Sequence, residues 1–156
     1  MTPSSLARDF RWAPLVPELL VADLTRSTAF WCGHVGFSVA YARPEEGFAY
    51  LDLDGAQIML EQQDDASRNW LTASLDPPLG RGINFQIEVG DLQAILDSLQ
   101  AAAWPLFMDL EEKWYRVGDH ERGQWQFLVQ DPDGYLLRLV ADLGVRQIGI
   151  AKATAE

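Results

Sequence analysis

Acidic and aromatic side chains supply most of the chemistry that this chain of 156 residues could perform. Side chains alternate between the two faces of a strand, and this alternation places Glu18, Glu61 and Glu88 on the polar faces of predicted strands. Carboxylates there can pair with the amines of a ligand. Trp114 and Tyr115 lie in an acidic stretch, where exposed rings can stack on a flat cation. These residues predict a surface that binds a small cationic or aromatic molecule. The alternatives are a solvated sheet face and a loop packed on its own body.

Three other side chains share the predicted polar strand faces with the glutamates. They are Met59, Asn84 and Arg138. Arg138 could contact a ligand, but it could equally neutralise one of the glutamates in a structural ion pair. We therefore take these three as candidate ligand-binding residues, with the structural pair as the alternative for Arg138.

Residues that commonly perform covalent or metal chemistry are few. The sequence has two histidines, His34 and His120, so one chain cannot assemble a metal site built mainly of imidazoles. Cys32 is the sole cysteine, so no internal disulfide can form, and nothing in the sequence marks it as a nucleophile. The sequence predicts no cofactor and no catalytic residue, although carboxylates could still contribute to a metal site. Whether the protein is an enzyme stays open at this point.

The charge balance is strongly acidic, with 23 acidic against 12 basic residues and a net charge of −11. This balance argues against nucleic-acid binding, which needs clustered Lys and Arg, and against docking on an anionic membrane. It favours a cationic partner, although keeping the protein dispersed would explain it as well. Neither a signal peptide nor a membrane-spanning stretch is predicted, which leads us to expect a cytoplasmic protein.

Hydrophobic periodicity and turn residues predict the same order of elements twice: a strand, a helix and three strands. Asp23 or Thr25 is expected to cap the first helix, and Asp91 the second. Gly36 is a plausible stop for the first helix. The predicted strands are 15–21, 37–42, 48–53 and 56–62 in the first half, then 83–89, 106–110, 124–130 and 135–141 in the second.

Two short internal matches support a duplication. The Leu19–Leu24 segment matches Ile87–Leu92 at an offset of 68, and Asp52–Gly55 matches Asp131–Gly134 at an offset of 79. The difference of eleven predicts an insertion around Glu111–Arg122. The expected organisation is an N-terminal arm (1–13), one domain (14–142) of two modules (14–62 and 83–142) joined by a linker (63–82), and a loose tail (143–156).

Two motifs resemble those of a known superfamily. Pro17–Phe37 (PELLVADLTRSTAFWCGHVGF) resembles its first-helix signature, and Asp131–Val140 (DPDGYLLRLV) resembles its closing hairpin. With the duplicated strand order, the chain resembles the vicinal oxygen chelate superfamily of glyoxalases, extradiol dioxygenases, and fosfomycin and bleomycin resistance proteins. The resemblance implies an α+β fold in which two βαβββ repeats form a half-open barrel or cup.

Metal enzymes of this superfamily place their ligands at four equivalent points. The resemblance maps those points onto Val16, Met59, Asn84 and Arg138, and none of the four is a normal ligand for the divalent ions these enzymes use. The resemblance therefore implies a bleomycin resistance-like binding protein, which sequesters a small cationic or aromatic molecule without chemistry. It further implies a homodimer, in which Thr2–Ala13 is the candidate for an exchanged arm. The alternative is a metal-dependent lyase or dioxygenase of the same superfamily with displaced ligands.

One pattern in the second half leaves its orientation undecided. Trp125 and Phe127 alternate with Gln124 and Gln126, so one of the two pairs faces the cup.

Overall fold

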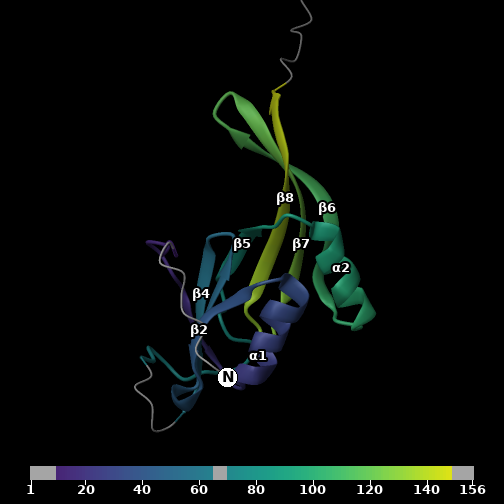
Figure 1. Cartoon of the computed structure of the whole chain (residues 1–156). Helices are drawn as coiled ribbons and strands as arrows, with labels where there is room; N and C mark the ends of the chain where they lie inside the picture. Colours follow the sequence, from purple (N-terminus) through teal and green to yellow (C-terminus); the bar gives the residue numbers. More distant parts are fainter. Residues whose placement is uncertain (1–9, 65–69, 149–156) are drawn as a thin grey trace, which may run out of the picture.

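The computed structural model describes residues 10–64 and 70–148. Figure 1 shows the order of the elements along the chain. They are β1 (Glu18–Val21), α1 (Leu24–Phe30), the π-helical turn η1 (Trp31–Val35), β2 (Ser38–Arg43), the 3-10 turn η2 (Pro44–Glu46), β3 (Phe48–Leu53), β4 (Ala56–Gln62), β5 (Asn84–Glu88), α2 (Leu92–Ala101), β6 (Leu106–Val117), β7 (His120–Gln130) and β8 (Leu136–Gln147).

The strands form two four-stranded mixed sheets with the same internal order. The first sheet runs β1-β4-β3-β2 and the second runs β5-β8-β7-β6. In the first sheet β1 pairs in parallel with β4, and in the second sheet β5 pairs in parallel with β8. All other strand pairs are antiparallel. The predicted α+β fold of two βαβββ repeats is therefore confirmed, and the sheets are consistent with the predicted cup.

The ends of both helices follow from the predicted residues. The carboxylates of Asp23 and Asp91 accept hydrogen bonds from the backbone N–H groups of Arg26 and Ala94, each at 2.9 Å, which satisfies donors that a helix N-terminus leaves free. The first helix continues through η1 and ends at Gly36, whose φ of 98° lies in the left-handed region that favours glycine.

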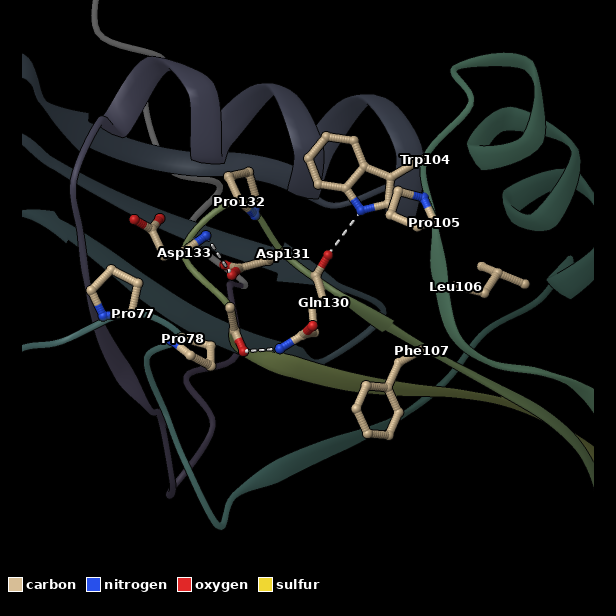
Figure 2. A pocket seen from close by; sticks show the side chains of 11 residues that line it. Pro77, Pro78, Trp104, Pro105, Leu106, Phe107, Gln130, Asp131, Pro132 and Asp133 are labelled. Carbon is tan, nitrogen blue, oxygen red and sulfur yellow. Dashed lines mark hydrogen bonds between the residues drawn. The ribbon is translucent and has the colours of Figure 1, made fainter.

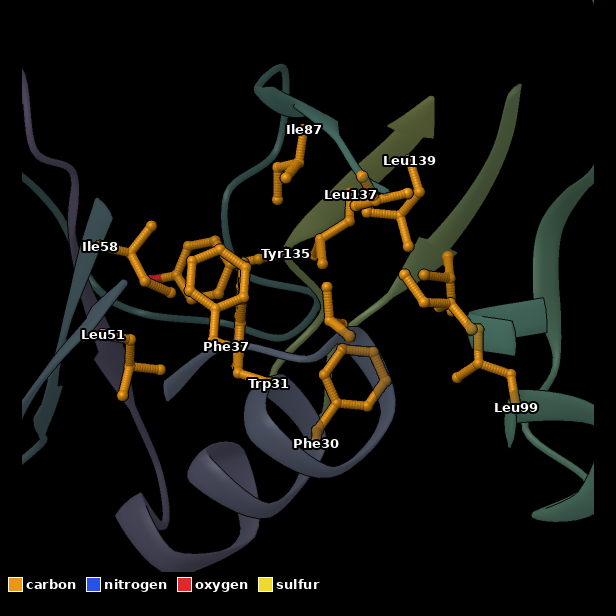
Figure 3. Close-up of a cluster of buried hydrophobic side chains, with 14 of the residues drawn as sticks. Phe30, Trp31, Phe37, Leu51, Ile58, Ile87, Leu99, Tyr135, Leu137 and Leu139 are labelled. Carbon is orange, nitrogen blue, oxygen red and sulfur yellow. The ribbon is translucent and has the colours of Figure 1, made fainter. Parts of the chain in front are cut away.

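One hydrophobic core joins the two repeats (Figure 3). Leu51 and Leu60 of the first sheet, Leu137 and Leu139 of the second, and Trp31 of η1 are all fully buried in it. Side chains alternate along a strand, so the residues between these core leucines point to the side of each sheet that faces away from the core. We call these other sides the first and the second open face.

The turn between β7 and β8 ties the second repeat to the first. The carboxylate of Asp131 accepts a hydrogen bond from the indole nitrogen of Trp31 at 3.1 Å. The carboxylate of Asp133 accepts from the Ser27 hydroxyl at 2.8 Å, and the Tyr135 hydroxyl donates to the Leu20 carbonyl at 3.0 Å. These contacts explain why the superfamily-like DPDG segment lies at the junction of the repeats rather than at a free hairpin tip.

The strand bounds predicted for the second repeat were too short. The strands predicted at 106–110 and 124–130 continue through the insertion as one long hairpin, and β8 runs to Gln147, so residues 143–147 are strand rather than loose tail. Figure 1 shows these three strands extending together beyond α2. Cross-strand ion pairs hold the extension, with Arg122 3.1 Å from Asp142 and Arg146 2.7 Å from Glu121. The predicted arm (1–9), part of the linker (65–69) and the end of the tail (149–156) lie outside the described residues.

Two glycines in Asp-Gly turns allow a matched test of the junction. Both Gly55 and Gly134 have positive φ, 92° and 101°. A Cβ on Gly55 would meet nothing within 4 Å, whereas a Cβ on Gly134 would lie 2.4 Å from the Cβ and 2.7 Å from the Cα of Pro78. We expect Gly55→Ala to cost about 1 kcal/mol of unfolding free energy and Gly134→Ala at least about 2 kcal/mol, because only the latter adds a backbone clash to the strain. Urea unfolding measures both, and equal losses would contradict the close packing of Pro78 on this turn.

Candidate functional site

The first open face carries three of the predicted ligand-binding residues. The parallel register of β1 and β4 sets Glu18 opposite Met59 and Leu20 opposite Glu61. Because side chains two residues apart share a face, Glu18, Met59 and Glu61 lie together on this side of the sheet. The predicted grouping of these three residues thus follows directly from the strand register.

Aromatic side chains fill the neighbouring part of the first open face. Tyr41 of β2 stacks on Tyr50 of β3 with ring centroids 5.2 Å apart. Phe48 lies beside them, and the guanidinium carbon of Arg43 sits 3.9 Å from its ring centroid. Arg43 also forms an ion pair with Glu46. The sequence analysis did not single out these rings, although the alternation of Phe48 and Tyr50 with Ala49 and Leu51 could have indicated them.

The residues before β1 cover one end of this face. Gln57, which is buried, accepts a hydrogen bond from the Ala13 backbone N–H at 2.7 Å and donates to the Arg11 carbonyl at 2.8 Å. Trp12 packs edge-on against Tyr50 with centroids 5.1 Å apart. The described end of the predicted arm therefore lies on the first open face of its own chain.

Glu18 and Glu61 form a carboxyl pair on the uncovered part of the face. The hydrogen bond that protonated Glu18 donates to Glu61, partial burial and the charge of Glu61 together raise the pKa of Glu18 to about 7, while the charge of Arg43 acts in the opposite direction. Because the neighbouring carboxyl repels a second negative charge, Glu18 keeps its proton to a higher pH than an isolated glutamate does. A cation beside the pair would offset that repulsion.

A cavity of about 400 Å³ opens next to Glu18. It lies between β1 and the linker, and Glu18, Trp70, Asp76 and Arg81 are among its lining residues. The Arg81 guanidinium donates to the carbonyls of the linker itself, including Pro77 at 3.0 Å, so it holds the loop in shape. The Trp70 side chain is 77% exposed at this cavity. An aromatic ring beside carboxylates is a surface on which a flat cation can bind.

The second open face carries three more predicted residues but has a different character. Gln86 of β5 pairs with Arg138 of β8, and Asn84 and Glu88 lie two residues to either side of Gln86. Glu88 lies 3.9 Å from Arg122 and forms its ion pair there. The structural pair of a glutamate with Arg138, which was the alternative for Arg138, is therefore not formed by Glu88. The buried Nε of Arg138 has no hydrogen-bond partner among the described residues. Arg138 is therefore placed on an amide-lined sheet face, apart from the Glu18 and Glu61 carboxyl pair.

The two remaining predicted residues, Trp114 and Tyr115, do not share one surface. Trp114 and Tyr115 are neighbours on β6, so their side chains point to opposite sides of the hairpin. The Tyr115 hydroxyl donates to Gln126 at 3.1 Å on the side of the second open face. Trp114 lies on the other side, with the guanidinium carbon of Arg146 4.1 Å from its ring.

The undecided orientation in β7 is resolved. Gln124 belongs to a small cavity with Glu88 and Val140, on the second open face. Phe127 is fully buried in the core, and Trp125 lines a cavity with Leu96 of α2. The glutamines therefore face the open side, and the two aromatic residues face α2.

A cavity of about 650 Å³ lies at the junction of the two repeats (Figure 2). Its walls include Trp104, whose indole nitrogen donates to the Gln130 carbonyl at 2.9 Å. Its two carboxylates are already bonded, since Asp131 accepts from Trp31 and from backbone N–H groups, and Asp133 accepts from Ser27. The polar groups here serve the junction, so we place the candidate site at Glu18 and Glu61 instead.

Comparison with known proteins agrees with this geometry. The family model described as Glyoxalase/Bleomycin resistance protein/Dioxygenase superfamily matches residues 14–139. The chain belongs to this superfamily. A bleomycin resistance protein of Geobacillus stearothermophilus is 27% identical over 135 residues, covering 78% of this chain and 91% of that protein.

Solved structures of other superfamily members show the same fold. TioX from Micromonospora sp. ML1 has a TM-score of 0.62 at 20% identity, covering 84% of this chain and 99% of the other. A lactoylglutathione lyase from Agrobacterium tumefaciens has a TM-score of 0.54 at 16% identity, covering 83% and 92%. These likenesses hold for the fold alone, because the superfamily fold carries different chemistries.

The residues at the metal positions of the superfamily do not fit a metal. Val16 has no donor atom, Met59 offers a soft thioether, Asn84 a single carbonyl, and Arg138 a permanent positive charge. Within residues 10–64 and 70–148, no three His, Cys, Asp or Glu side chains converge as a metal would require. Among these residues there is also no helix with the length and apolar character to cross a bilayer.

Trp70 is the site residue that the sequence analysis missed. It stands in a stretch that composition marks only as a polar linker with prolines. Its place beside Glu18 depends on how residues 70–81 fold back over β1, and no periodicity encodes that path.

Proposed function

We propose that this superfamily member binds a small cationic or aromatic molecule and holds it without modifying it. The observation that carries the proposal is the Glu18–Glu61 carboxyl pair, whose Glu18 has a raised pKa and lines a cavity together with Trp70. A bound cation would neutralise the pair, and the indole would contribute a cation–π contact worth about 0.5–2 kcal/mol.

The finer parts of the proposal have separate support. The similarity to bleomycin resistance proteins supports a role in antibiotic resistance. We propose in addition that the protein acts in the cytoplasm as a homodimer. The net charge of −11 supports a cationic ligand, because it raises the local concentration of cations around the site. Asn84, Glu88, Arg138 and Tyr115 remain candidate contacts on the second open face.

Calorimetric titration tests the proposal with three probes: bleomycin, the flat cation proflavine, and acridine, which has the same ring system and is uncharged at pH 8. We expect at least one cation to bind, with an affinity that falls as salt rises, and acridine to bind at least about tenfold more weakly. Failure of all three probes to bind at millimolar concentration would overturn the proposal. Equal binding of proflavine and acridine would overturn the cationic form of the ligand and leave the aromatic one.

Variants then assign the binding to the proposed site. Trp70→Ala is expected to weaken proflavine binding about three- to thirtyfold through loss of the ring contact. Trp114→Ala is the control, because it removes a partly buried indole that lies away from the cavity. Equal losses in the two variants would place the ligand elsewhere.

A further inference from the structure

Helix α2 is too short to cover the side of the second sheet on which it packs. With 10 residues it is about 15 Å long, whereas β7 with 11 residues and β8 with 12 each span about 35–40 Å. Figure 1 shows the sheet continuing past the helix. Apolar side chains near the edge of this cover are therefore only partly shielded from water.

A cavity of about 270 Å³ lies where the helix cover is incomplete. On the helix side its walls are Leu92, Gln93 and Leu96. On the sheet side they are Leu110, Trp125 and Ala141. This cavity lies on the side of the second sheet opposite to the second open face, so it is separate from every residue of the proposed function.

Two local features keep the cavity unfilled. The pairing of β6 with β7 shifts register between Met108 and Glu111, which places Leu110 in an irregular part of the strand. Leu139, the preceding β8 residue on this side of the sheet, is fully buried. Ala141 follows it on the same side and has only a methyl group, so it fills less of the space under the helix. Trp125 is left 39% exposed although it faces the helix.

The lining chemistry defines the class of ligand. Five of the six side chains are apolar, and burying the exposed part of Trp125 would stabilise a complex at about 25 cal/mol per Å² of apolar surface. Glu112 pairs with Trp125 across the strands, and its carboxylate accepts a hydrogen bond from Trp114 at 2.7 Å. A carboxylate beside the opening disfavours anionic ligands.

The size of the cavity sets the size of the ligand. An apolar cavity of about 150 Å³ holds one benzene ring, so 270 Å³ suits a molecule of two fused rings and is too small for a helix or a strand of a partner protein. We propose that this cavity binds an uncharged two-ring aromatic molecule.

The amide of Gln93 sets one polar feature of that ligand. Its nitrogen donates to Asp97 at 2.7 Å, Gln93 lines the cavity, and its amide oxygen is a hydrogen-bond acceptor. A hydroxyl on the ligand could donate to this oxygen.

Titration with 2-naphthol and with 2-naphthoate tests the site in the full-length protein. We expect 2-naphthol to bind one molecule per chain, and 2-naphthoate, which is anionic at pH 7, to bind at least about tenfold more weakly. Ala141→Leu is expected to fill the cavity and to weaken 2-naphthol binding at least about tenfold. Ala94→Leu adds the same atoms to an exposed position of α2 and should leave binding unchanged.

Thermal unfolding of both variants separates filling from damage. A filled cavity should leave the Tm of Ala141→Leu at or above that of the wild type. The proposal is overturned if the wild type does not bind 2-naphthol up to its solubility, if Ala141→Leu binds it as tightly as the wild type does, or if naphthoate binds equally well. Failure here would leave the Glu18–Glu61 proposal untouched, because the two sites share no residue.

Discussion

Replacing Asp131 by alanine should lower the free energy of unfolding by about 3 kcal/mol at pH 7. The carboxylate accepts hydrogen bonds from the Trp31 indole and from the backbone N–H groups of Asp133 and Tyr135. Trp31 is fully buried and Tyr135 nearly so, hence the freed donors would not regain water. Each buried donor left without an acceptor costs about 1–3 kcal/mol, and removal of a poorly solvated carboxylate offsets part of that sum.

Two comparison variants sharpen this expectation. Asp131→Asn keeps one oxygen for the two backbone donors but cannot also accept from Trp31, so it should cost about 1–2 kcal/mol. Asp97→Ala removes an exposed carboxylate bonded to Gln93 at 2.7 Å and should cost no more than about 0.5 kcal/mol. Urea unfolding measures all three. A loss for Asp131→Ala as small as that for Asp97→Ala would show that the turn does not hold the repeats together.

The unfolding free energy lost on replacing Asp131 should also depend on pH. Burial raises the pKa of Asp131 to about 6 from a usual 3.8, so between these values the folded protein binds more protons than the unfolded chain. The stability that this group contributes is therefore greatest at low pH and falls as pH rises through this window. The cost of Asp131→Asn should be about 1 kcal/mol larger at pH 5 than at pH 7. A cost that does not change with pH would mean that the carboxyl is not held in its protonated form by burial.

The fold was predictable because local and repeated signals agree. Asp23, Asp91 and Gly36 mark the helix ends by capping chemistry that acts within a few residues. The strands 48–53 and 56–62 were predicted with their observed bounds, since an Asp-Gly turn separates two runs of apolar residues. In the second repeat the prediction failed where strand pairing depends on partners far away. Residues 143–147 are strand because they pair with the beginning of β7, some twenty residues earlier in the chain.

The candidate site, too, was predictable where the signal is local and was missed where it depends on tertiary packing. Glu18, Met59 and Glu61 could be grouped from alternation alone, because two-residue periodicity fixes the side of a strand. Trp114 and Tyr115 were grouped because they are neighbours in an acidic stretch between two predicted strands, and a strand separates neighbours onto opposite sides. Trp70 joins the site through the path of a linker, which is determined by tertiary packing rather than by any local pattern.

Binding of a cation at the first open face should release a proton. The pKa of Glu18 is raised to about 7, chiefly by its hydrogen bond with Glu61, so near neutral pH Glu18 is still protonated in part of the molecules. A bound cation favours the doubly ionised pair and lowers that pKa, so affinity should rise with pH until the proton is already lost. For one linked proton, proflavine should bind about tenfold more weakly at pH 6 than at pH 8.

Substitution of one member of the pair separates charge from protonation. Glu18→Gln leaves Glu61 without a carboxyl neighbour on β1, so the change in affinity between pH 6 and pH 8 should disappear, and affinity at pH 8 should fall several-fold with the loss of one charge. Asp97→Asn carries the same net charge and should keep the wild-type pH profile. Calorimetry in two buffers of different ionisation enthalpy counts the released protons directly.

The stability of Glu18→Gln rules out a trivial loss of binding. In the wild type the raised pKa means that ionisation of Glu18 destabilises the folded chain, so this group favours folding below about pH 4.5 and loses that contribution as pH rises toward 7. Removing the repulsion should leave the variant at least as stable as the wild type at pH 8. Weaker binding by such a stable variant, with no pH profile, can arise only if the ligand contacts the carboxyl pair itself. A variant that keeps the tenfold pH profile would assign the linked proton to another group and remove Glu18 from the site.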